Sequence, residues 1–489
     1  MKDAEEFIEQ VEKKAREWDI SAVLSIRDRE GFQYRKAFGY ADRAQGRPMT
    51  LEDRFCLDTE NGFFLTLCVM DLMQRGKLRL SDKAGRFLPE YRYGDRITVR
   101  NLLRWDSGVE DYWGAVQMPA LQKDPAHAAL SDRKRFQREY ELRARDIPFQ
   151  EVLDGVGGRE LTHAPGREDD GSETGVVFLG EIVRRVSGMT AREYVFERFF
   201  RPLGMADTRP GNDATTALYG VLRDTDLVPL PQLAPASAFT TTLGDMEQLA
   251  RAMVDKRFFS EKTWSLMQKR TWRMNTFGFS QKGELYYADF YPMKLRDTCQ
   301  LCLNFDDGVS ILMLNNEEQK FKPDGNGHWR HFASDLRRAW QDTRVYPQKP
   351  EMKRVNGKNI WDAMDIELLP EQLAFVPGSS SCIAATLARK QPVYVLMDHD
   401  LPIGIAALNI EPKKKRYDVS FLLVDHRYQG RGYGRILLTR AIEVLKKKGA
   451  AGLEIGVNRF NIPAQRLYRS VGFEDKEVYD EFIEMKMTL

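Results

Sequence analysis

The sequence lacks several features that would assign it to a specialised class of protein. Its five cysteines among 489 residues are too few, and odd in number, for a disulfide framework, so we expect reduced thiols. It has no uninterrupted apolar run of membrane-spanning length, and its first residues are too charged for a signal peptide. The charges nearly cancel (74 Lys and Arg, 72 Asp and Glu), which leaves no field that would attract nucleic acid or a membrane. These absences predict a cytoplasmic protein with small or neutral partners.

Two cysteines have the spacing that redox and zinc sites use. Cys299 and Cys302 are three residues apart, but no second Cys/His pair lies close by in the sequence. The surrounding run Thr298–Phe305 is typical of a strand, in which residues three apart face opposite sides. The sequence therefore predicts a buried strand here and no metal site.

The chain is too long for one typical core, and its length suggests about two to four domains. A break falls at Tyr346-Pro-Gln-Lys-Pro-Glu351, where two prolines and polar residues follow an aromatic, helix-like stretch. We therefore predict one domain over residues 1–345, a linker over 346–352 and a second domain over 353–489.

Strand and helix periods alternate beyond the break. They predict helices over Asp362–Val376, over Ser380–Arg389, after Gly434 and over Ile462–Val471. They predict strands after Lys353, over Tyr394–Met397, Gly404–Ile410, Tyr417–Val424 and Gly452–Val457, and near Phe482–Met487. This order indicates an α/β sheet with helices on its faces.

A glycine-rich turn joins the apolar strand Val419–Val424 to the helical run Ile436–Lys448. Gly430, Gly432 and Gly434 permit positive φ and a close approach of the backbone to a ligand. The helix start aims N–H groups and a positive dipole end at an anion. The lysine–hydroxyl pair of a Walker loop is missing, so glycine spacing alone predicts a diphosphate site without naming the diphosphate.

Two motifs in this order resemble the GCN5-related N-acetyltransferase (GNAT) family over about residues 353–489. They are Gln429-Gly-Arg-Gly-Tyr-Gly434 and Asn461-Ile-Pro-Ala-Gln-Arg-Leu-Tyr468. The opening of the domain, Asn359-Ile-Trp-Asp and then Leu369–Val376, is most similar to the diamine and polyamine branch. The resemblance implies acetyl-CoA as the cofactor. The residues that it implies as cofactor contacts are Gln429, Gly430, Arg431, Gly432, Tyr433, Gly434 and Arg435 in the loop, the backbone of Leu422, Leu423 and Val424, and Asn461.

The same resemblance implies a set of residues around the acceptor amine. Tyr468 stands at the family's general-acid position, and a phenol keeps its proton near pH 7. Asp418, eleven residues before Gln429, stands where histone-type members carry a base, and Ser420 is two residues further on. By analogy we expect the carboxylates of three further residues to line a pocket for a cationic substrate: Glu367, Glu371 and Glu454.

Two basic runs are expected to face solvent. Lys413-Lys-Lys-Arg416 is typical of a hairpin turn, and Lys446-Lys-Lys448 suits a helix C-terminus, where the dipole favours cations. The first run has a second interpretation, contact with the 3′-phosphate of coenzyme A.

A series of phrases in the first 345 residues resembles the serine β-lactamase and penicillin-binding-protein family, in its class C and esterase-like branch, over roughly residues 5–343. The phrases are Gly76-Lys-Leu-Arg-Leu-Ser-Asp82, Phe87-Leu-Pro-Glu-Tyr91, Ile97–Leu103 with Ser107-Gly108, Gly180–Gly188 and Arg201-Pro-Leu-Gly-Met205. This resemblance implies a helical part packed against an antiparallel sheet, with late strands at Thr298–Phe305 and Val309–Asn315.

The resemblance also locates where acyl-transfer chemistry would lie. Thr59 falls at the position of the nucleophilic serine and Gly62 at that of the lysine of S-x-x-K. Gly171-Ser-Glu173 falls at the Y-x-N motif, and Tyr291-Pro-Met293 at the H/K-x-G strand. A glycine cannot act as a base, so we expect a domain that keeps the fold without the activity.

Together these patterns predict a multidomain protein, an α+β β-lactamase/transpeptidase-like domain followed by an α/β GNAT domain. We expect an acetyl-CoA-dependent N-acetyltransferase that acts on a primary amine, polyamine-like or part of an antibiotic, by direct attack in a ternary complex. The degenerate first domain would be a substrate-binding or architectural partner. Two alternatives stay open: a ligand-binding or sensor protein that uses the N-terminal cleft, and a serine-hydrolase-like enzyme with altered catalytic residues.

Overall fold

The structure, a computed structural model, consists of two compact units, each described here by itself. It describes residues 4–59, 62–167, 171–223, 226–268, 279–282, 285–290, 299–320, 322–323, 329–344, 349–357, 359–398 and 401–489. The N-terminal unit comprises Met1–Phe321 and His331–Arg337, and the C-terminal unit comprises Lys322–Arg330 and Arg338–Leu489. The sequence-based limits at 345 and 353 stay predictions.

Six strands of the described residues form the main sheet of the N-terminal unit, in the order β10-β11-β12-β13-β1-β2 with every pair antiparallel. Their bounds are β1 Ala22–Arg27, β2 Gln33–Phe38, β10 Ser280–Lys282, β11 Leu285–Phe290, β12 Cys299–Asn304 and β13 Val309–Asn315. The two late strands confirm the prediction. Cys299 and Cys302 are both buried in β12, as expected for a strand in the core.

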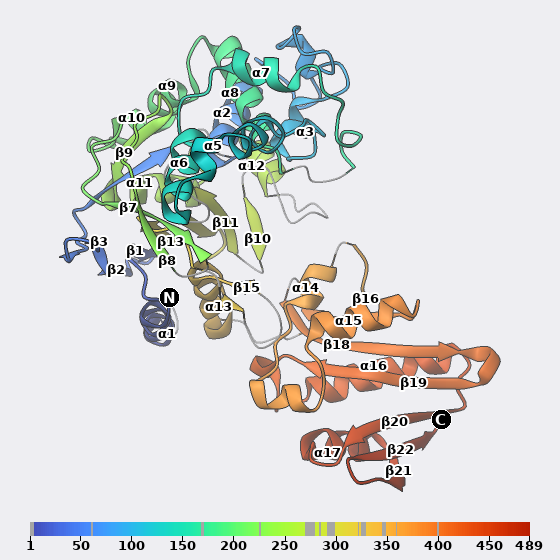
Figure 1. The fold of residues 1–489 in the computed structure, drawn as a ribbon. Helices are drawn as coiled ribbons and strands as arrows, with labels where there is room; N and C mark the ends of the chain where they lie inside the picture. Colours follow the sequence, from blue (N-terminus) through green and yellow to red (C-terminus); the bar gives the residue numbers. More distant parts are fainter. Residues whose placement is uncertain are drawn as a thin grey trace. The chain divides into compact units, whose positions relative to one another are not determined.

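Most helices of the N-terminal unit lie on one side of this sheet, whereas α1 and α13 lie on the other (Figure 1). Their bounds are α1 Ala4–Trp18, α2 Gly62–Gln74, α3 Val99–Leu103, α4 Met118–Gln122, α5 Pro125–Ala128, α6 Asp132–Arg143, α7 Phe149–Val156, α8 Glu173–Ser187, α9 Ala191–Val195, α10 Arg201–Leu203, α11 Leu243–Val254, α12 Glu261–Met267 and, spanning both units, α13 Phe332–Arg344. Short strands complete the unit: β3 Tyr40–Asp42, β4 Arg47–Pro48, β5 Arg54–Asp58, β6 Arg209–Pro210, β7 Leu218–Leu222, β8 Asp226–Leu230 and β9 Ala238–Thr242.

Helix α2 is the centre of the helical part because it is apolar all round. Every residue from Phe63 to Leu72 is buried, and a helix without a polar face has to lie inside a core. It packs against α8 and α9, and its Phe64 ring makes edge contacts with Phe200 and Phe239. This places the start of α2, where the serine motif of the family would lie, in the interior of the unit.

A seven-stranded sheet forms the C-terminal unit, in the order β16-β17-β18-β19-β20-β22-β21. The strand bounds are β16 Glu351–Arg354, β17 Val393–Asp398, β18 Leu401–Glu411, β19 Arg416–Val424, β20 Gly452–Asn458, β21 Glu474–Val478 and β22 Phe482–Thr488. The helices are α14 Ile360–Met364, α15 Ser379–Ala388, α16 Tyr433–Lys447 and α17 Ile462–Val471. The short two-stranded pair β14 Lys322–Pro323 and β15 Trp329–Arg330 stands apart from this sheet.

Two apolar cores lie on opposite faces of the seven-stranded sheet, because alternate residues of β18 point to opposite sides. Ala406 and Leu408 belong to the core under α16 and α17, whereas Ile405 and Ala407 belong to the core under α14 and α15. Figure 1 shows α14 and α15 beside the β16–β18 half and α17 beside β20–β22. The α/β prediction for this unit is therefore confirmed.

The sequence-based assignment was wrong at three places in this unit. The helix expected over 362–376 ends at Met364 and is followed by a separate 3-10 turn, Pro370–Ala374, since the residue before a proline avoids the helical region. The strand expected after Lys353 is β16, which already ends at Arg354. Strand β21 was missed because all five of its residues are exposed and carry no apolar alternation.

An ion pair inside the unit fixes the start of the glycine loop. The Asp425 side chain is fully buried and accepts hydrogen bonds from Arg427 Nε at 2.7 Å and Nη2 at 2.8 Å. It also accepts from the amides of Arg427 (3.1 Å) and Glu367 (3.0 Å), so it joins the loop to the segment after α14. Such a bridge stabilises less than its geometry suggests, but removing one partner leaves the other charge buried.

None of the helices in the described ranges has the length and apolar character that a bilayer crossing requires.

We predict that Asp425→Ala destabilises the C-terminal unit by about 3–5 kcal/mol, because the buried Arg427 would lose its ion pair with Asp425. Denaturant unfolding of the full chain, with hydrogen exchange of β19–α16 peptides, measures the change. The matched control is Asp475→Ala, which breaks the exposed pair with Arg469 and should cost about 0–1 kcal/mol. Equal losses in the two variants would contradict the anchoring role of Asp425.

Candidate functional site

The loop before α16 has the backbone that the glycines predicted, at two of the three positions. Gly430 has φ +73° and Gly432 has φ +87°, a region that residues with a side chain rarely adopt. A Cβ at either position would meet no atom within 4 Å in the described part of the chain. The space above both glycines is therefore open to a ligand.

Gly434 differs, and the expectation of a positive φ there was wrong. It lies inside the first turn of α16, where a Cβ would be 3.1 Å from Leu467 Cδ2 and 3.7 Å from Val424 Cγ2. Its lack of a side chain lets α16 pack closely against α17 and the end of β19. Gly434 thus acts through helix packing.

Unbonded amides collect at this loop. The N–H groups of Gly430, Gly432 and Gly434 donate to no group among the described residues, whereas those of Arg435 and Ile436 both donate to the Gly432 carbonyl. Helix α16 is 15 residues long, and its N-terminal end carries a partial positive charge. Open amides and a dipole end directed at one space form an anion site.

Other predicted loop residues hold the loop in place. The Gln429 side chain donates to the Val424 carbonyl at 2.7 Å and forms a reciprocal amide pair with Gln372 (2.8 and 3.2 Å). Arg435 donates to the Ser470 carbonyl at 2.9 Å and so ties α16 to α17.

Three more predicted contacts occupy different environments. Tyr433 is buried, with its ring 6.2 Å from that of Tyr428, while Arg431 is exposed. The Asn461 side chain caps α17 by accepting from the Ala464 amide at 3.2 Å.

The end of β19 has an unpaired edge. β19 and β20 are parallel neighbours with one residue pair, Asp418↔Glu454, so the strands separate beyond it. The Asp425 amide donates to the Ile403 carbonyl, and alternation along an antiparallel pair then directs the polar groups of Leu423 to β18. The N–H and C=O groups of Leu422 and Val424 point the other way, into the gap. Of the three predicted backbone contacts, Leu423 is thus turned away from the gap.

Tyr468 lies on α17 in the core beside β20 and β22. It is buried, its ring centroid is 6.1 Å from that of Phe473, and burial raises its pKa to about 12. No hydrogen bond joins its hydroxyl to any residue within the described ranges. The phenol is therefore protonated at neutral pH and keeps its proton available.

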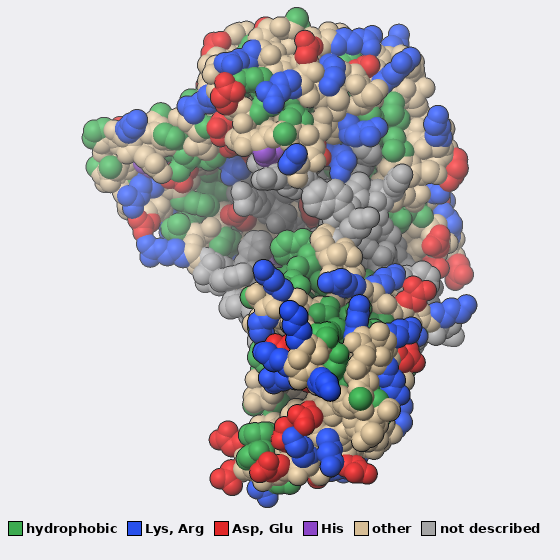
Figure 2. Space-filling view, turned by 90° about the vertical axis from the view of Figure 1, so that its right-hand side faces the viewer, with side chains coloured by type: hydrophobic (Ala, Val, Ile, Leu, Met, Phe, Trp, Pro, Cys, Tyr) green, Lys and Arg blue, Asp and Glu red, His purple; other side chains and the backbone are tan. Residues whose placement is uncertain are grey.

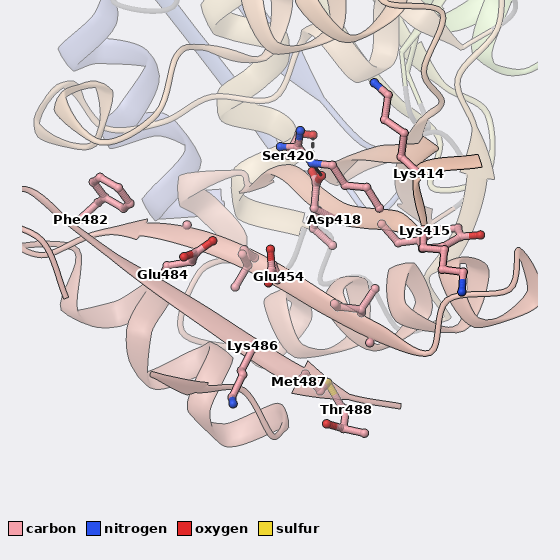
Figure 3. A pocket seen from close by; sticks show the side chains of 17 residues that line it. Lys414, Lys415, Asp418, Ser420, Glu454, Phe482, Glu484, Lys486, Met487 and Thr488 are labelled. Atoms are coloured by element: carbon pink, nitrogen blue, oxygen red, sulfur yellow. Dashed lines mark hydrogen bonds and ion pairs between the residues drawn. The ribbon is translucent and has the colours of Figure 1, made fainter. Parts of the chain in front are cut away.

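A cavity of about 740 Å³ opens beside the junction of β19 with β20. Asp418, Ser420 and Glu454 line it, as do Glu484 and Phe482 of β22. Figure 3 shows Phe482 and Glu484 at one end, Lys414 and Lys415 at the other, and the remaining acidic residues and Ser420 between them. This face of β20 and β22 is the one opposite the α17 core.

The Asp418 carboxylate is held on both oxygens. Asn409 Nδ2 of β18 donates to Oδ2 and Ser420 Oγ donates to Oδ1, each at 2.8 Å, and Arg416 lies 3.6 Å away. The register shift of β18 against β19 falls at this point, between Ala407 and Leu408. The structure thus brings together Asp418, Ser420 and Glu454.

The other two predicted acidic residues lie elsewhere. Glu367 is buried near His426, with 3.8 Å between Glu367 Oε2 and His426 Nε2, and Glu371 is exposed on the 3-10 turn. Neither residue lines the cavity. Sequence reasoning missed two groups that act on the cavity, Asn409 and Lys476. Counting register back from the 413–416 turn would have placed Asn409 opposite Asp418, whereas nothing in the sequence pointed to Lys476.

The N-terminal unit differs from a serine hydrolase at the start of α2. Thr59 is fully buried, and both its amide (3.1 Å) and its hydroxyl (2.9 Å) donate to the Ser237 carbonyl. At Gly62, an added Cβ would be 3.7 Å from Trp105 Nε1, so the indole occupies the space beside the position of the family lysine. The hydroxyl has a fixed acceptor, and no basic side chain emerges from position 62.

A second cavity, of about 400 Å³, remains in this unit near Asp58 and Ser237. Tyr112 and Trp113 form part of its wall, and Arg143 pairs there with Glu173, the third residue of the Y-x-N position. Burial raises the pKa of Asp111, which also lines it. Residues 291–293, expected at the H/K-x-G strand, lie outside the described residues.

Sequence comparison agrees with both folds. Residues 8–319 match the Beta-lactamase family, and residues 362–473 match the Acetyltransferase (GNAT) family. The chain therefore belongs to the β-lactamase family and carries a GNAT acetyltransferase domain at its C-terminal end.

Its individual relatives resemble the N-terminal unit. Penicillin-binding protein 4* of Bacillus subtilis (strain 168) is 29% identical over 179 residues, 37% of this chain and 35% of that protein. Esterase EstB of Burkholderia gladioli is 30% identical over 197 residues, 38% of this chain and 46% of that protein. The chain thus spans between about a third and a half of the length of these relatives. A solved penicillin binding protein from Bacillus halodurans shares the fold (TM-score 0.52, 19% identity, 68% of this chain and 98% of that one).

We predict that Gly432→Val raises the Kd for acetyl-CoA by at least about tenfold, a loss of ~1.4 kcal/mol, because its side chain fills the open space of the loop. Calorimetry on the full chain measures it. Gly449→Val is the matched control, since Gly449 also has a positive φ (+96°) but follows the other end of α16. An unchanged Kd in Gly432→Val, or an equal rise in the control, would rule out this loop as the coenzyme site.

Proposed function

We propose that the protein is an acetyl-CoA-dependent N-acetyltransferase that acetylates a primary amine. The observation that carries the proposal is the set of open amides at Gly430, Gly432 and Gly434, which lies next to the unpaired edge of β19. The match of residues 362–473 to the GNAT family supports the same conclusion.

The residues present fit acetyl-CoA. The amides at the start of α16 suit its diphosphate, and the backbone of Leu422 and the N–H of Val424 offer hydrogen-bonding groups to an extended, amide-bearing chain lying in the gap. Gln429 contributes indirectly, since its bond to the Val424 carbonyl fixes the loop against the strand. When bound, acetyl-CoA supplies the acetyl group as a thioester, whose C–S bond breaks as the new C–N bond forms.

The protein's own groups then carry out two proton transfers, one from the amine and one to the departing sulfur. An amine with a pKa near 10 is mostly charged at pH 7, so a base has to accept its proton before attack. Asp418 faces the cavity and is fixed by Asn409 and Ser420, which makes it our choice for the base. Tyr468 Oη is our choice for the acid that protonates the sulfur. Transfer is direct, within a complex of protein, coenzyme and amine.

The first experiment is an acceptor assay with the full chain. Acetyl-CoA is mixed with a panel of primary amines, including polyamines and amine-bearing antibiotics, and the release of coenzyme A thiol is followed. Release that depends on the amine, with the N-acetyl product seen by mass spectrometry, supports the proposal. Tight coenzyme binding without transfer to any amine would favour the ligand-binding alternative.

Tyr468→Phe should lower kcat by roughly 10²–10⁴-fold, the usual range for the loss of one acid or base. The ring stays in the core, so the Kd for acetyl-CoA should change little. Because burial raises the pKa of Tyr468 to about 12, the wild-type rate should not fall with deprotonation of this group below about pH 11. Tyr394→Phe on β17 is the control. Full activity of Tyr468→Phe would show that water protonates the sulfur.

For the N-terminal unit we propose a domain without acyl-transfer activity. The buried Thr59 hydroxyl is bonded to a carbonyl, and a hydroxyl without a base within reach is a weak nucleophile. The cavity of about 400 Å³ favours a ligand-binding role over a purely architectural one.

The full chain should therefore hydrolyse neither a chromogenic cephalosporin nor a nitrophenyl ester, and mass spectrometry should find no adduct with a fluorescent penicillin. Thr59→Ala is the control for background hydrolysis, which it should leave unchanged. A stable acyl group on Thr59, or turnover that Thr59→Ala abolishes, would make the protein a bifunctional enzyme and reverse this conclusion.

A further inference from the structure

The lining of the cavity beside β19 and β20 carries charges of both signs, and they are not mixed evenly. Strand register places Arg416 and Thr488 at one end, Asp418, Glu454 and Lys486 in the middle, and Ser420 and Glu484 further on. Lys414 and Lys415 join Arg416 at the first end, on the turn between β18 and β19. The cations therefore lie mainly at the turn, and the carboxylates lie toward the gap.

Two of the three carboxylates share one cation, Lys476. Lys476 of β21 lies 2.7 Å from Glu454 Oε1 and 3.4 Å from Glu484 Oε2, so one ammonium bridges both. The hydrogen bond to Glu454 is the main cause that raises the pKa of Lys476, which keeps this lysine charged. Asp418 is the lining carboxylate that Lys476 does not reach. Asp418, whose own cation partner is Arg416 at 3.6 Å, is thus the carboxylate of the cavity that lies next to the edge of β19 and outside the reach of Lys476.

The turn end has an excess of positive charge. Lys415 has a positive φ (+50°) and is exposed, and Lys414 shares one contact, with Glu411 at 3.2 Å. On the face of the C-terminal unit that Figure 2 draws, basic side chains spread over the upper part and acidic side chains gather mainly at the lower end. A molecule with ammonium groups at both ends would have to place one of them among these cations.

We propose that the acceptor is an amine whose opposite end carries an anionic group, a carboxylate or a phosphate. Its amine lies at Asp418 and Ser420, beside the gap where the acetyl group arrives, and its anion lies at Lys414 and Lys415. This inference rests on the acetyltransferase proposal and narrows its acceptor class. It disfavours a simple polyamine, the class that the sequence suggested, because a second ammonium is repelled at the turn.

The length of the acceptor follows from the strand. Two residues lie between Lys415 and Asp418, and three steps of about 3.3 Å along an extended chain put the two charged ends on the order of 10 Å apart. A chain of about six carbons between amine and anion fits this distance.

The test uses four acceptors that share a primary amine at one end of a six-carbon chain and differ at the other end: 6-aminohexanoate, 6-aminohexyl phosphate, 6-aminohexanol and 1,6-diaminohexane. With the full chain and acetyl-CoA, kcat/KM should be at least about tenfold higher for the two anionic acceptors than for the diamine, with the alcohol between them. Comparing the first two distinguishes carboxylate from phosphate. The preference should shrink as salt is raised, since the turn is exposed.

The variant is Lys414→Gln/Lys415→Gln, which should remove most of the preference by raising KM for the anionic acceptors while leaving the diamine unchanged or improved. The control is Lys446→Gln/Lys447→Gln, an equal charge loss at the end of α16 and outside the cavity, which should keep it. A diamine used as well as the anionic acceptors, or equal effects of both double variants, would overturn the inference.

Two further outcomes separate this inference from the function it rests on. If acetyl-CoA binds and polyamines are acetylated while the anionic acceptors are not, the acetyltransferase proposal holds and the acceptor class is wrong. If acetyl-CoA does not bind, the proposed function is wrong and the acceptor class is rejected with it.

Discussion

The C-terminal unit depends on how early two neighbouring strands stop pairing. β19 and β20 share one residue pair, at Asp418 and Glu454, and then separate. A fully paired sheet would use the polar backbone groups of Leu422 and Val424 internally, and no edge would remain for a ligand. The separation leaves those groups beside the loop amides and opens the neighbouring cavity. The proposed coenzyme and acceptor sites therefore both depend on one interruption in the sheet.

In the proposal made above, the N-terminal unit keeps the β-lactamase fold without acyl-transfer chemistry. The sheet and helices are stabilised by buried apolar residues such as those of α2, and their packing does not require a nucleophile at the site. At the start of that helix, Thr59 bonds a backbone carbonyl and Trp105 lies over Gly62. These contacts stabilise the fold at the place where the family's nucleophile would lie. If this unit has no reacting group, the ligand of its cavity is not restricted to molecules that such a group can attack.

The sequence predicted the regular parts of the molecule well because apolar periodicity follows burial directly. Strands β17–β20 and helices α15–α17 stand where the pattern placed them. It failed where burial gives no pattern: β21 is entirely exposed, and the segment after Met364 is held by side-chain bonds such as that of Asp425 to the Glu367 amide. For the site, motif spacing pointed to the loop and to Asp418, whereas Glu454, which pairs with Asp418 in the sheet, was placed only by analogy. Spacing could not separate Gly434, which packs against Leu467, from glycines with a positive φ. It also could not reveal that Lys476 pairs with Glu454, because Lys476 lies on β21, a strand that the sequence did not predict.

That exposed strand has a consequence for how the protein behaves in a concentrated solution. β21 is the outermost strand on one side of the seven-stranded sheet, and β16 is outermost on the other. An outer strand offers unpaired N–H and C=O groups to any extended chain that approaches it. Here β21 reads Glu-Asp-Lys-Glu-Val and β16 reads Glu-Met-Lys-Arg, so an incoming strand meets charged side chains along both borders. These charges disfavour edge-to-edge pairing of the sheets of two molecules. The same charged residues that kept β21 from being predicted therefore reduce aggregation of the folded protein.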